Sequence, residues 1–514
     1  MNKLIIFIGT ICALLWGFIT AITFGIPDFW CKTIDQISFH LMSREIFKMS
    51  NGFYYDVSNN DMPTIIFLIL FGIIFALVFF LVCRVEKHSS KKPPLKLIIF
   101  FSILFRVIIL PSELIHENDM YRYIWDGKTT LHKINPYKYA PADIFMYEHG
   151  FTDDYYDSDK EVTIKGKVFN ASDEQNLTKL LQLRDQNPIL YERIGHWEVP
   201  TIYPPITQIL FTIPVLFNGN SLILMKFFFV LFDIGSFFLI ISLLKYLKVN
   251  PCLSIVYGWS PLVLVEISNG GHYDSIPIFL TLLSLLLYFK GRQKEGACFL
   301  AFATLSKFFS GVLLPILLKP FRVRHVFLFA GIITFFYLPF IVWDQTGIKG
   351  IFQGFITYNQ QWFYNDSIFT LIRVILKKTS SHLTLSLMPA KIIAGCVYLT
   401  ILAVLIVKRS KGDLDTLHKC FLAIALLFII NPVADPWYFC WVIPFLCFFP
   451  YKSWYLLSGL LMLSYLNFHS DIGTVEMQFL GISLIRWLTY APFFLYLAIE
   501  CLWKPKFIQN GFQP

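Results

Sequence analysis

Charged side chains are scarce in this chain. Asp, Glu, Lys and Arg make up 15% of its 514 residues, whereas soluble domains carry about 25%. Hydrophobic residues make up 56%, there are 54 Phe, and the mean hydropathy is +0.60. Such a chain cannot cover a water-facing surface over most of its length, which excludes a soluble globular protein. We expect an all-α polytopic membrane protein, because helices satisfy their own backbone groups within lipid.

Patterns typical of metal centres and disulfide scaffolds are also missing. No Cys-x-x-Cys or His-x-x-x-His spacing occurs. Of the ten cysteines, only Cys31 lies clearly in a loop on the side of the membrane opposite the loops rich in Lys and Arg. We therefore expect no disulfide framework. No cofactor is predicted with certainty, and a divalent cation is left open. The net charge of +9 comes from Lys and Arg at the ends of apolar runs, where basic residues set the orientation of membrane helices. We therefore expect no nucleic acid partner.

Apolar runs of about 20 residues, the length that crosses a bilayer, follow one another along the chain. From them we expect about 12 transmembrane helices. The first run is too long for a signal-peptide core and is expected to be retained. The runs are 4–25, 63–83, 95–112, 203–217, 221–245, 252–267, 272–289, 296–318, 325–343, 385–407, 416–431, 436–450, 453–468 and 479–502.

The distribution of Lys and Arg predicts which loops face the cytoplasm, because short cytoplasmic loops are enriched in both. The loops 268–274, 432–436 and 469–478 contain neither residue. We therefore place both termini in the cytoplasm and residues 113–200 outside it. The predicted cytoplasmic loops are marked by Arg84, Lys87, Lys91, Lys92, Lys96, Lys245, Lys248, Lys290, Arg292, Lys294, Lys319, Arg322, Arg324, Lys408, Arg409, Lys411, Lys419, Lys504 and Lys506.

Two apolar runs break this alternation. The run 203–217 would start and end outside, and 296–318 would start and end inside, and both contain Pro. We predict re-entrant hairpins there, which protein or a water-filled cavity must shield. The predicted segments are N-terminal transmembrane helices 1–112, an outer loop region 113–200, a transmembrane core 201–344, an outer loop with a short helix 345–384, and C-terminal transmembrane helices 385–514.

A dense polar stretch, residues 116–128, follows the run 95–112 directly. It combines carboxylates with Arg122 and several aromatic residues. Carboxylates beside an Arg at the membrane surface suit chemistry on an anionic, lipid-linked substrate. In a helix, Asp119 and Arg122 would share a face. The alternatives are an aromatic belt at the membrane interface and, for Asp119, the N-cap of a following helix.

This stretch resembles the signature of the GT-C glycosyltransferases, and is most similar to that of bacterial mannosyltransferases that use polyprenyl-phosphate sugars. Asn118 stands where a first acid is usual, Glu117 is displaced by one position, and Lys133 replaces a Gly. These departures argue against a two-carboxylate or metal-dependent mechanism and leave a single base. The matching parts are Asp119, Tyr121-Arg122-Tyr123, Trp125-Asp126-Gly127, Ile134-Asn135-Pro136-Tyr137, Tyr203-Pro204-Pro205, Gly271-His272-Tyr273-Asp274, Leu305-Ser306-Lys307 and Asp435-Pro436-Trp437-Tyr438.

The resemblance implies a GT-C fold that transfers a hexose, with mannose favoured, from a polyprenyl-phosphate donor to a glycan, glycolipid or protein acceptor. It places the enzyme in a bacterial inner membrane, in contact with lipid, with its active site on the non-cytoplasmic face. Asp119 is the expected general base, and Arg122 is expected to orient it or to bind phosphate with its planar fork. The expected substrate-binding residues are Glu117, Tyr121, Tyr123, Trp125, Asp126, Lys128, Asn135, Tyr137, Tyr203, His272, Asp274, Lys307, Asp435 and Trp437.

Two other classes of protein share this composition. A transporter of lipid-linked substrates would use intramembrane charges such as Asp233, Lys226 or Lys307, but such folds often contain internal repeats, and the sequence shows none. A polysaccharide polymerase or ligase would rely on large late loops with Arg and His, whereas the chemistry here lies in the first large loop. Both classes remain alternatives to a glycosyltransferase.

Overall fold

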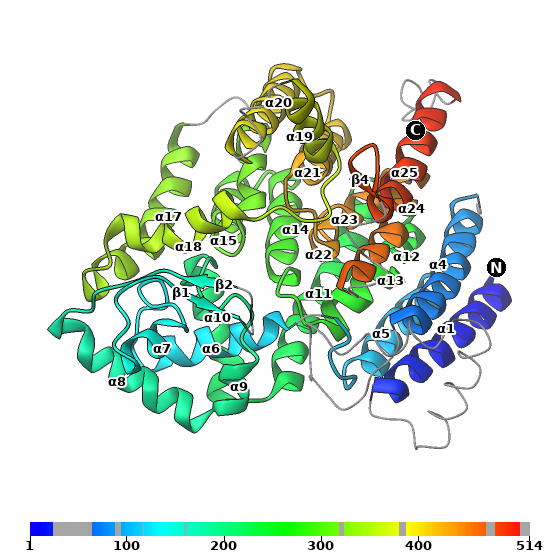
Figure 1. Ribbon diagram of the computed structural model, residues 1–514. Helices are drawn as coiled ribbons and strands as arrows, with labels where there is room; N and C mark the ends of the chain where they lie inside the picture. Colours follow the sequence, from blue (N-terminus) through cyan, green and yellow to red (C-terminus); the bar gives the residue numbers. More distant parts are fainter. Residues whose placement is uncertain are drawn as a thin grey trace. The chain divides into compact units, whose positions relative to one another are not determined.

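The structure is a computed structural model, in which helices make up almost all of the regular structure (Figure 1). Glu117, Cys31, most of the loop 469–478 and several of the basic loop residues fall outside the part of the chain that it describes. The described residues are 1–23, 64–87, 94–116, 118–158, 160, 162–317, 323–379, 387–468 and 478–503.

The described chain divides into two compact units, each built from separate segments. The first unit contains Met1–Ile115, Phe237–Asn269 and Phe363–Pro514, and the second contains His116–Ser236 and Gly270–Trp362. Strands are confined to two small antiparallel pairs, one in each unit. They are β1 (Tyr155–Asp157) with β2 (Val162–Ile164), and β3 (Gln478–Phe479) with β4 (Ile482–Ser483).

The first unit is a group of apolar helices with close backbone contacts. A Cβ on Gly9 would lie 2.7 Å from the ring of Phe101, so this glycine lets α1 approach α5. Its helices are α1 (Asn2–Thr23), α4 (Thr64–Glu86), α5 (Leu95–Ile109), η2 (Pro251–Ser254), α12 (Ile255–Gly258), α13 (Pro261–Val263), the π-helix η3 (Leu264–Asn269), α19 (Ile368–Thr379), α20 (Leu387–Val407), α21 (Asp413–Ile430), α22 (Pro436–Phe439), α23 (Ile443–Leu446), α24 (Lys452–Leu460), η7 (Leu461–Phe468) and α25 (Leu484–Trp503).

The second unit combines apolar helices with the short helices of the polar region 116–200. Helix α11 begins in this unit and continues into the first. Its helices are α6 (Asp119–Leu131), α7 (Asp143–Glu148), α8 (Ala171–Gln186), α9 (Pro188–Glu192), α10 (Pro205–Phe217), α11 (Leu222–Tyr246), α14 (Ser275–Phe289), α15 (Gln293–Thr304), η4 (Phe308–Leu313), α16 (Leu314–Leu317), α17 (Val323–Val342), η5 (Trp343–Gln345) and α18 (Gly347–Gln361).

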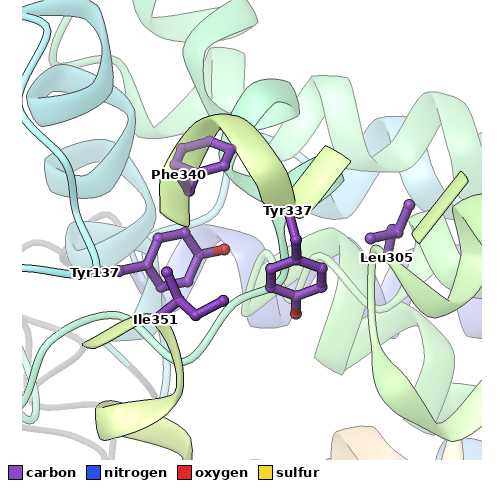
Figure 2. Close-up of a cluster of buried hydrophobic side chains, with 5 residues drawn as sticks. All are labelled: Tyr137, Leu305, Tyr337, Phe340 and Ile351. Atoms are coloured by element: carbon purple, nitrogen blue, oxygen red, sulfur yellow. The ribbon is translucent and has the colours of Figure 1, made fainter. Parts of the chain in front are cut away.

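A buried apolar cluster fixes the loop after α6 within the second unit. Figure 2 shows Tyr137 of this loop packed with Tyr337 and Phe340 of α17, Ile351 of α18 and Leu305, which follows α15. All five are at most 7% exposed. Burying side chains of this size contributes about 1.5–3 kcal/mol each relative to leaving them exposed, so the loop is held to α17 and α18 by packing.

The helices confirm a polytopic membrane protein, but they do not confirm 12 spans. Six described helices are long and apolar enough to cross a membrane, or seven if Pro251–Gly258 and Pro261–Asn269, bent by 49°, form one span. Helices Pro205–Phe217, Ser275–Phe289 and Phe308–Leu317 are apolar but shorter. The six are Asn2–Thr23, Ile66–Glu86, Leu222–Tyr246, Val323–Gln345, Leu387–Val407 and Leu484–Leu502.

The two predicted re-entrant hairpins differ in the structure. The run 296–318 is interrupted where expected: α15 ends at Thr304, and η4 begins at Phe308 after an extended Lys307. The prediction for 203–217 is wrong, because this run forms one helix, α10, in place of a hairpin. Pro205 takes the first helical position, where a missing N–H costs no hydrogen bond, and so it starts a helix there.

Candidate active site

The predicted base lies in the first turn of α6. Asn118 is the N-cap of this helix, and its Nδ2 donates to the carbonyl of Arg193 at 2.9 Å. Asp119 is the first helical residue and is partly exposed. The alternative that Asp119 is the N-cap is therefore wrong. The N-terminal end of a helix carries partial positive charge, which attracts anionic groups to this end of α6.

Tyr123 holds the Asp119 carboxylate from one turn further along α6. Its hydroxyl donates to Asp119 Oδ2 at 3.0 Å. The Tyr123 ring is buried and stacks on Phe211 of α10, with ring centroids 4.7 Å apart. Burial first, and the nearby Asp119 charge second, raise the pKa of Tyr123 well above its ordinary value. The hydroxyl therefore stays protonated and remains a donor.

Three tyrosines from distant segments meet beside Asp119, and we call them the tyrosine triad. The ring centroids of Tyr123 and Tyr203 are 5.3 Å apart, those of Tyr123 and Tyr273 are 5.4 Å apart, and those of Tyr203 and Tyr273 are 5.2 Å apart. All three pairs are edge-to-face, an arrangement that aromatic rings favour. The triad joins three of the predicted motifs into one cluster.

Two motif glycines permit this approach. A Cβ on Gly271 would lie 2.2 Å from Met120 Sδ, and Gly271 has a φ of +66°, which favours glycine. A Cβ on Gly127 would lie 2.7 Å from the carbonyl oxygen of Phe211. The absence of a side chain at these positions therefore lets the turn 270–274 and helix α10 lie directly against α6.

A buried ion pair lies on the other side of Tyr273. Lys307 Nζ is 2.7 Å from Asp274 Oδ1 and 4.7 Å from the centroid of the Tyr273 ring. The Asp274 side chain is 1% exposed and that of Lys307 is 14% exposed. His272, in the same turn, is fully buried. The contacts thus run from Asp119 through Tyr123 and Tyr273 to Lys307.

Arg122 is fully engaged in holding a loop. Its Nε donates to Asp126 Oδ1 at 2.8 Å, and its two terminal nitrogens donate to the carbonyls of His196 and Val199, each at 3.0 Å. Arg122 is 5% exposed. The expectation that it binds phosphate or orients Asp119 does not fit this geometry, because every nitrogen of its fork already has a partner. We assign Arg122 the role of positioning the loop 196–199 against α6.

Arg122→Lys should therefore destabilise the protein although it keeps the positive charge. An ammonium cannot reproduce the planar fork, and losing two hydrogen bonds of a charged group is expected to lower the free energy of unfolding by about 2–4 kcal/mol. Thermal unfolding of the detergent-purified variant measures this. The matched control is Arg184→Lys, since Arg184 pairs with Glu148 and Asp185 at the surface, where pairs contribute about 0–1 kcal/mol. Equal losses in both variants would contradict the role assigned to Arg122.

Several predicted substrate-binding residues serve the architecture in the structure. Asn135 Nδ2 donates to the carbonyl of Phe340 at 2.8 Å, and the Tyr137 hydroxyl donates to the carbonyl of Tyr203 at 2.6 Å. Trp125 is 2% exposed. These contacts show that the three residues also help to hold the site together, and their substrate-binding role stays a prediction.

Other predicted residues of α6 make further contacts within the second unit. Tyr121 accepts a hydrogen bond at its hydroxyl from Arg193 at 3.0 Å. Asp126 accepts from both Arg122 and Gln208. Lys128 is 9% exposed, and a Cβ on Gly219 would lie 2.9 Å from its Nζ. Asp126 thus pairs with Arg122.

Asp435 and Trp437 belong to the first unit, and their predicted role stays a prediction. Asp435 precedes α22 and is 8% exposed, and the ring of Trp437 contacts that of Tyr438, with centroids 5.7 Å apart. Lys226 and Asp233 are both buried in α11.

A polar loop that includes His196 and Glu198 lies near Asp119 and was not among the predicted site residues. His196 Nδ1 lies 3.7 Å from Glu198 Oε1, and the His196 side chain is 56% exposed. Loss of hydration would lower the pKa of His196, but the Glu198 carboxylate and then the Asp119 charge outweigh it, so the pKa is raised. Gln208, fully buried, donates to Asp126 and to Thr201. Only the His196-Trp197-Glu198 triplet could have signalled this loop.

Buried charges in the first unit were also missed. Arg106 is 1% exposed and donates to the carbonyls of Ser102 and Gly258, and Glu266 in the π-helix η3 accepts from the Tyr465 hydroxyl. The sequence did mark them, because Arg106 and Glu266 are ionisable residues inside apolar runs, and such residues are functional candidates by default.

Metal ligands are not grouped in the described residues: no three His, Cys, Asp or Glu side chains there lie close enough to hold a metal ion.

Comparison with known proteins gives one match. Residues 367–471 match the family model described as the MptB C-terminal domain. No curated protein and no solved structure matches the chain significantly. The matched residues lie in the first unit and the Asp119 cluster lies in the second. Together with the apolar helices, the match points to a membrane protein related to a glycosyltransferase family.

Proposed function

We propose that this chain is an integral-membrane glycosyltransferase that transfers a hexose, with mannose favoured, from a polyprenyl-phosphate donor to a hydroxyl of a glycan, glycolipid or protein. Asp119 is its general base. The observation that carries the proposal is the placement of Asp119. Its carboxylate is partly exposed, oriented by the Tyr123 hydroxyl, and connected through the tyrosine triad to the Lys307 cation.

The reaction needs a base for the acceptor hydroxyl and a group that stabilises the departing phosphate. Asp119 takes the proton of the acceptor hydroxyl while the hydroxyl oxygen bonds to the anomeric carbon of the donor sugar. The bond from that carbon to the phosphate oxygen breaks, and the electron pair leaves with the polyprenyl phosphate. Lys307 supplies the cation that stabilises this added charge.

The Lys307–Asp274 pair suits the phosphate end of this reaction. Asp274, whose side chain is enclosed, holds the Lys307 ammonium in place, while the Lys307 side chain as a whole is 14% exposed. A cation held in place beforehand stabilises developing charge without reorganising during the reaction.

The proposal is tested by assaying membranes that contain the protein with a panel of radiolabelled polyprenyl-phosphate sugars. We expect label from one donor, polyprenyl-phosphate mannose first, to appear in a product that membranes without the protein do not form. Failure of transfer from every donor, combined with movement of a lipid-linked sugar across sealed vesicles, would favour a transporter instead.

The proposed orientation can be tested by cysteine labelling. We expect Asp154→Cys to react with a membrane-impermeant maleimide from the non-cytoplasmic side, and Lys87→Cys to react only from the cytoplasmic side. Both variants need a background in which Cys31, expected in an outer loop, and the exposed Cys396 and Cys501 are replaced by Ser. The two introduced cysteines reacting from one side would overturn the orientation.

A further inference from the structure

A row of aromatic side chains lies along one face of α18, and we call it the α18 row. Phe355, Tyr358 and Trp362 are spaced by three and four residues, so they follow one another on the same side of the helix and its end. The ring centroids of Phe355 and Tyr358 are 6.5 Å apart, and those of Tyr358 and Trp362 are 4.8 Å apart. Phe355 is 37% exposed, which leaves part of the row open.

Each end of the α18 row meets a residue beside the candidate site. At one end, Phe355 contacts Phe308, with ring centroids 5.0 Å apart, and Phe308 follows Lys307 in the chain. At the other end, Trp362 contacts the imidazole of His196, with centroids 4.5 Å apart. The Asp119 carboxylate acts electrostatically on this same imidazole. The row therefore extends between the surroundings of the phosphate-binding cation and those of the base.

The loop that carries His196 is fixed in an unusual conformation. His196 has a φ of +50°, a region that non-glycine residues seldom adopt, and its carbonyl accepts from Arg122. A Cβ on Gly354 of α18 would lie 2.4 Å from the carbonyl oxygen of Pro200, so α18 packs tightly against the same loop. Backbone outliers of this kind persist where surrounding contacts enforce them, often at binding sites.

We propose that the α18 row together with His196 is the binding site for the acceptor sugar. A pyranose ring stacks on Trp362, and His196, paired with Glu198, hydrogen-bonds one acceptor hydroxyl so that another faces Asp119. This inference rests on the proposed function and extends it to the acceptor. A carbohydrate fits better than the polyprenyl chain of the donor, because the row ends at a polar His–Glu pair whose imidazole is half exposed.

The test compares variants at Trp362 and His196 with polyprenyl-phosphate mannose as the donor and octyl mannoside as the acceptor probe. Trp362→Ala should raise the KM for octyl mannoside about tenfold, the usual contribution of one aromatic contact, with the KM for the donor unchanged. Trp362→Phe should restore most of the affinity. His196→Asn, which tolerates the positive φ, should also raise the acceptor KM. Tyr156→Ala is the matched control, since Tyr156 is 59% exposed in the same unit and should leave both KM values unchanged.

A second measurement separates this inference from the proposed function. Saturation-transfer NMR detects octyl mannoside bound to the purified protein without any turnover. We expect binding to the wild type and a loss of binding in Trp362→Ala or, if that variant does not accumulate, in Trp362→Leu. An unchanged acceptor KM or a raised donor KM in the Trp362 variants would overturn the acceptor site while leaving the transferase intact. Mannoside binding that depends on Trp362, without transfer from any donor, would keep the site and overturn the transferase.

Discussion

Asp119→Asn is expected to reduce sugar transfer by about 10²–10⁴-fold, the usual contribution of a general base. Asparagine keeps the size of the side chain and can still accept the Tyr123 hydrogen bond, but it cannot take a proton from the acceptor hydroxyl. Folding, expression and donor binding should therefore survive. Initial rates in membranes, normalised to the amount of protein, measure the effect.

The matched control is Glu117→Gln, which removes the other carboxylate at the start of this stretch. We expect a mild effect if Asp119 acts alone. Wild-type transfer by Asp119→Asn together with an inactive Glu117→Gln would place the base at Glu117. Full activity of both variants would show that residues 116–128 are not the catalytic centre, and the transporter alternative would gain support.

Lys307→Met should lower transfer by about 10²–10³-fold, as expected when one preorganised group that stabilises a leaving oxyanion is lost. The same change leaves Asp274 buried without its cation, which is expected to destabilise the protein by about 3–5 kcal/mol. Reduced activity alone would therefore not distinguish a catalytic from a structural role. Transfer rate and thermal stability must be measured together.

The double variant Lys307→Met with Asp274→Asn separates the two roles. It removes both charges of the pair, so stability should return toward that of the wild type. Transfer should stay low, because the cation is still missing. Recovery of activity along with stability would show that Lys307 only neutralises Asp274, and the stabilisation of the leaving phosphate would then have to be assigned to another cation.

The course of the helices could be predicted from the sequence because lipid imposes a simple length rule. The run 221–245 corresponds to α11, Leu222–Tyr246, and the interruption near Lys307 lies where Ser306, Gly311 and Pro315 indicated it. The run 203–217 was misassigned since Pro204 and Pro205 can either break a helix or start one. Composition does not distinguish a helix that is broken at a proline from one that begins there, because the outcome depends on the conformation of the residues before the proline.

The site was predictable in its residues but not in their roles. Asp119 stands out as a carboxylate after an apolar run, and the glycines of the motifs hint at close approach. Arg122 looked like a substrate ligand because nothing in the sequence reveals that the carbonyls of His196 and Val199 face it. The α18 row was missed for a similar reason. Its partners, Phe308 and His196, are brought to it only by the tertiary fold.

The way in which Arg122 holds its loop has a consequence for protein engineering. Its two terminal nitrogens bind backbone carbonyls at positions 196 and 199, and every amino acid presents the same carbonyl. The side chains of His196 and Glu198, which are not buried in the core, can therefore be exchanged, within the limits of the backbone conformation, without removing the bonds that hold the loop. A library randomised at positions 196 and 198, with Arg122 and the buried Trp197 and Val199 retained, should thus yield folded variants that differ in the sugar they accept, so that new specificity can be selected separately from stability.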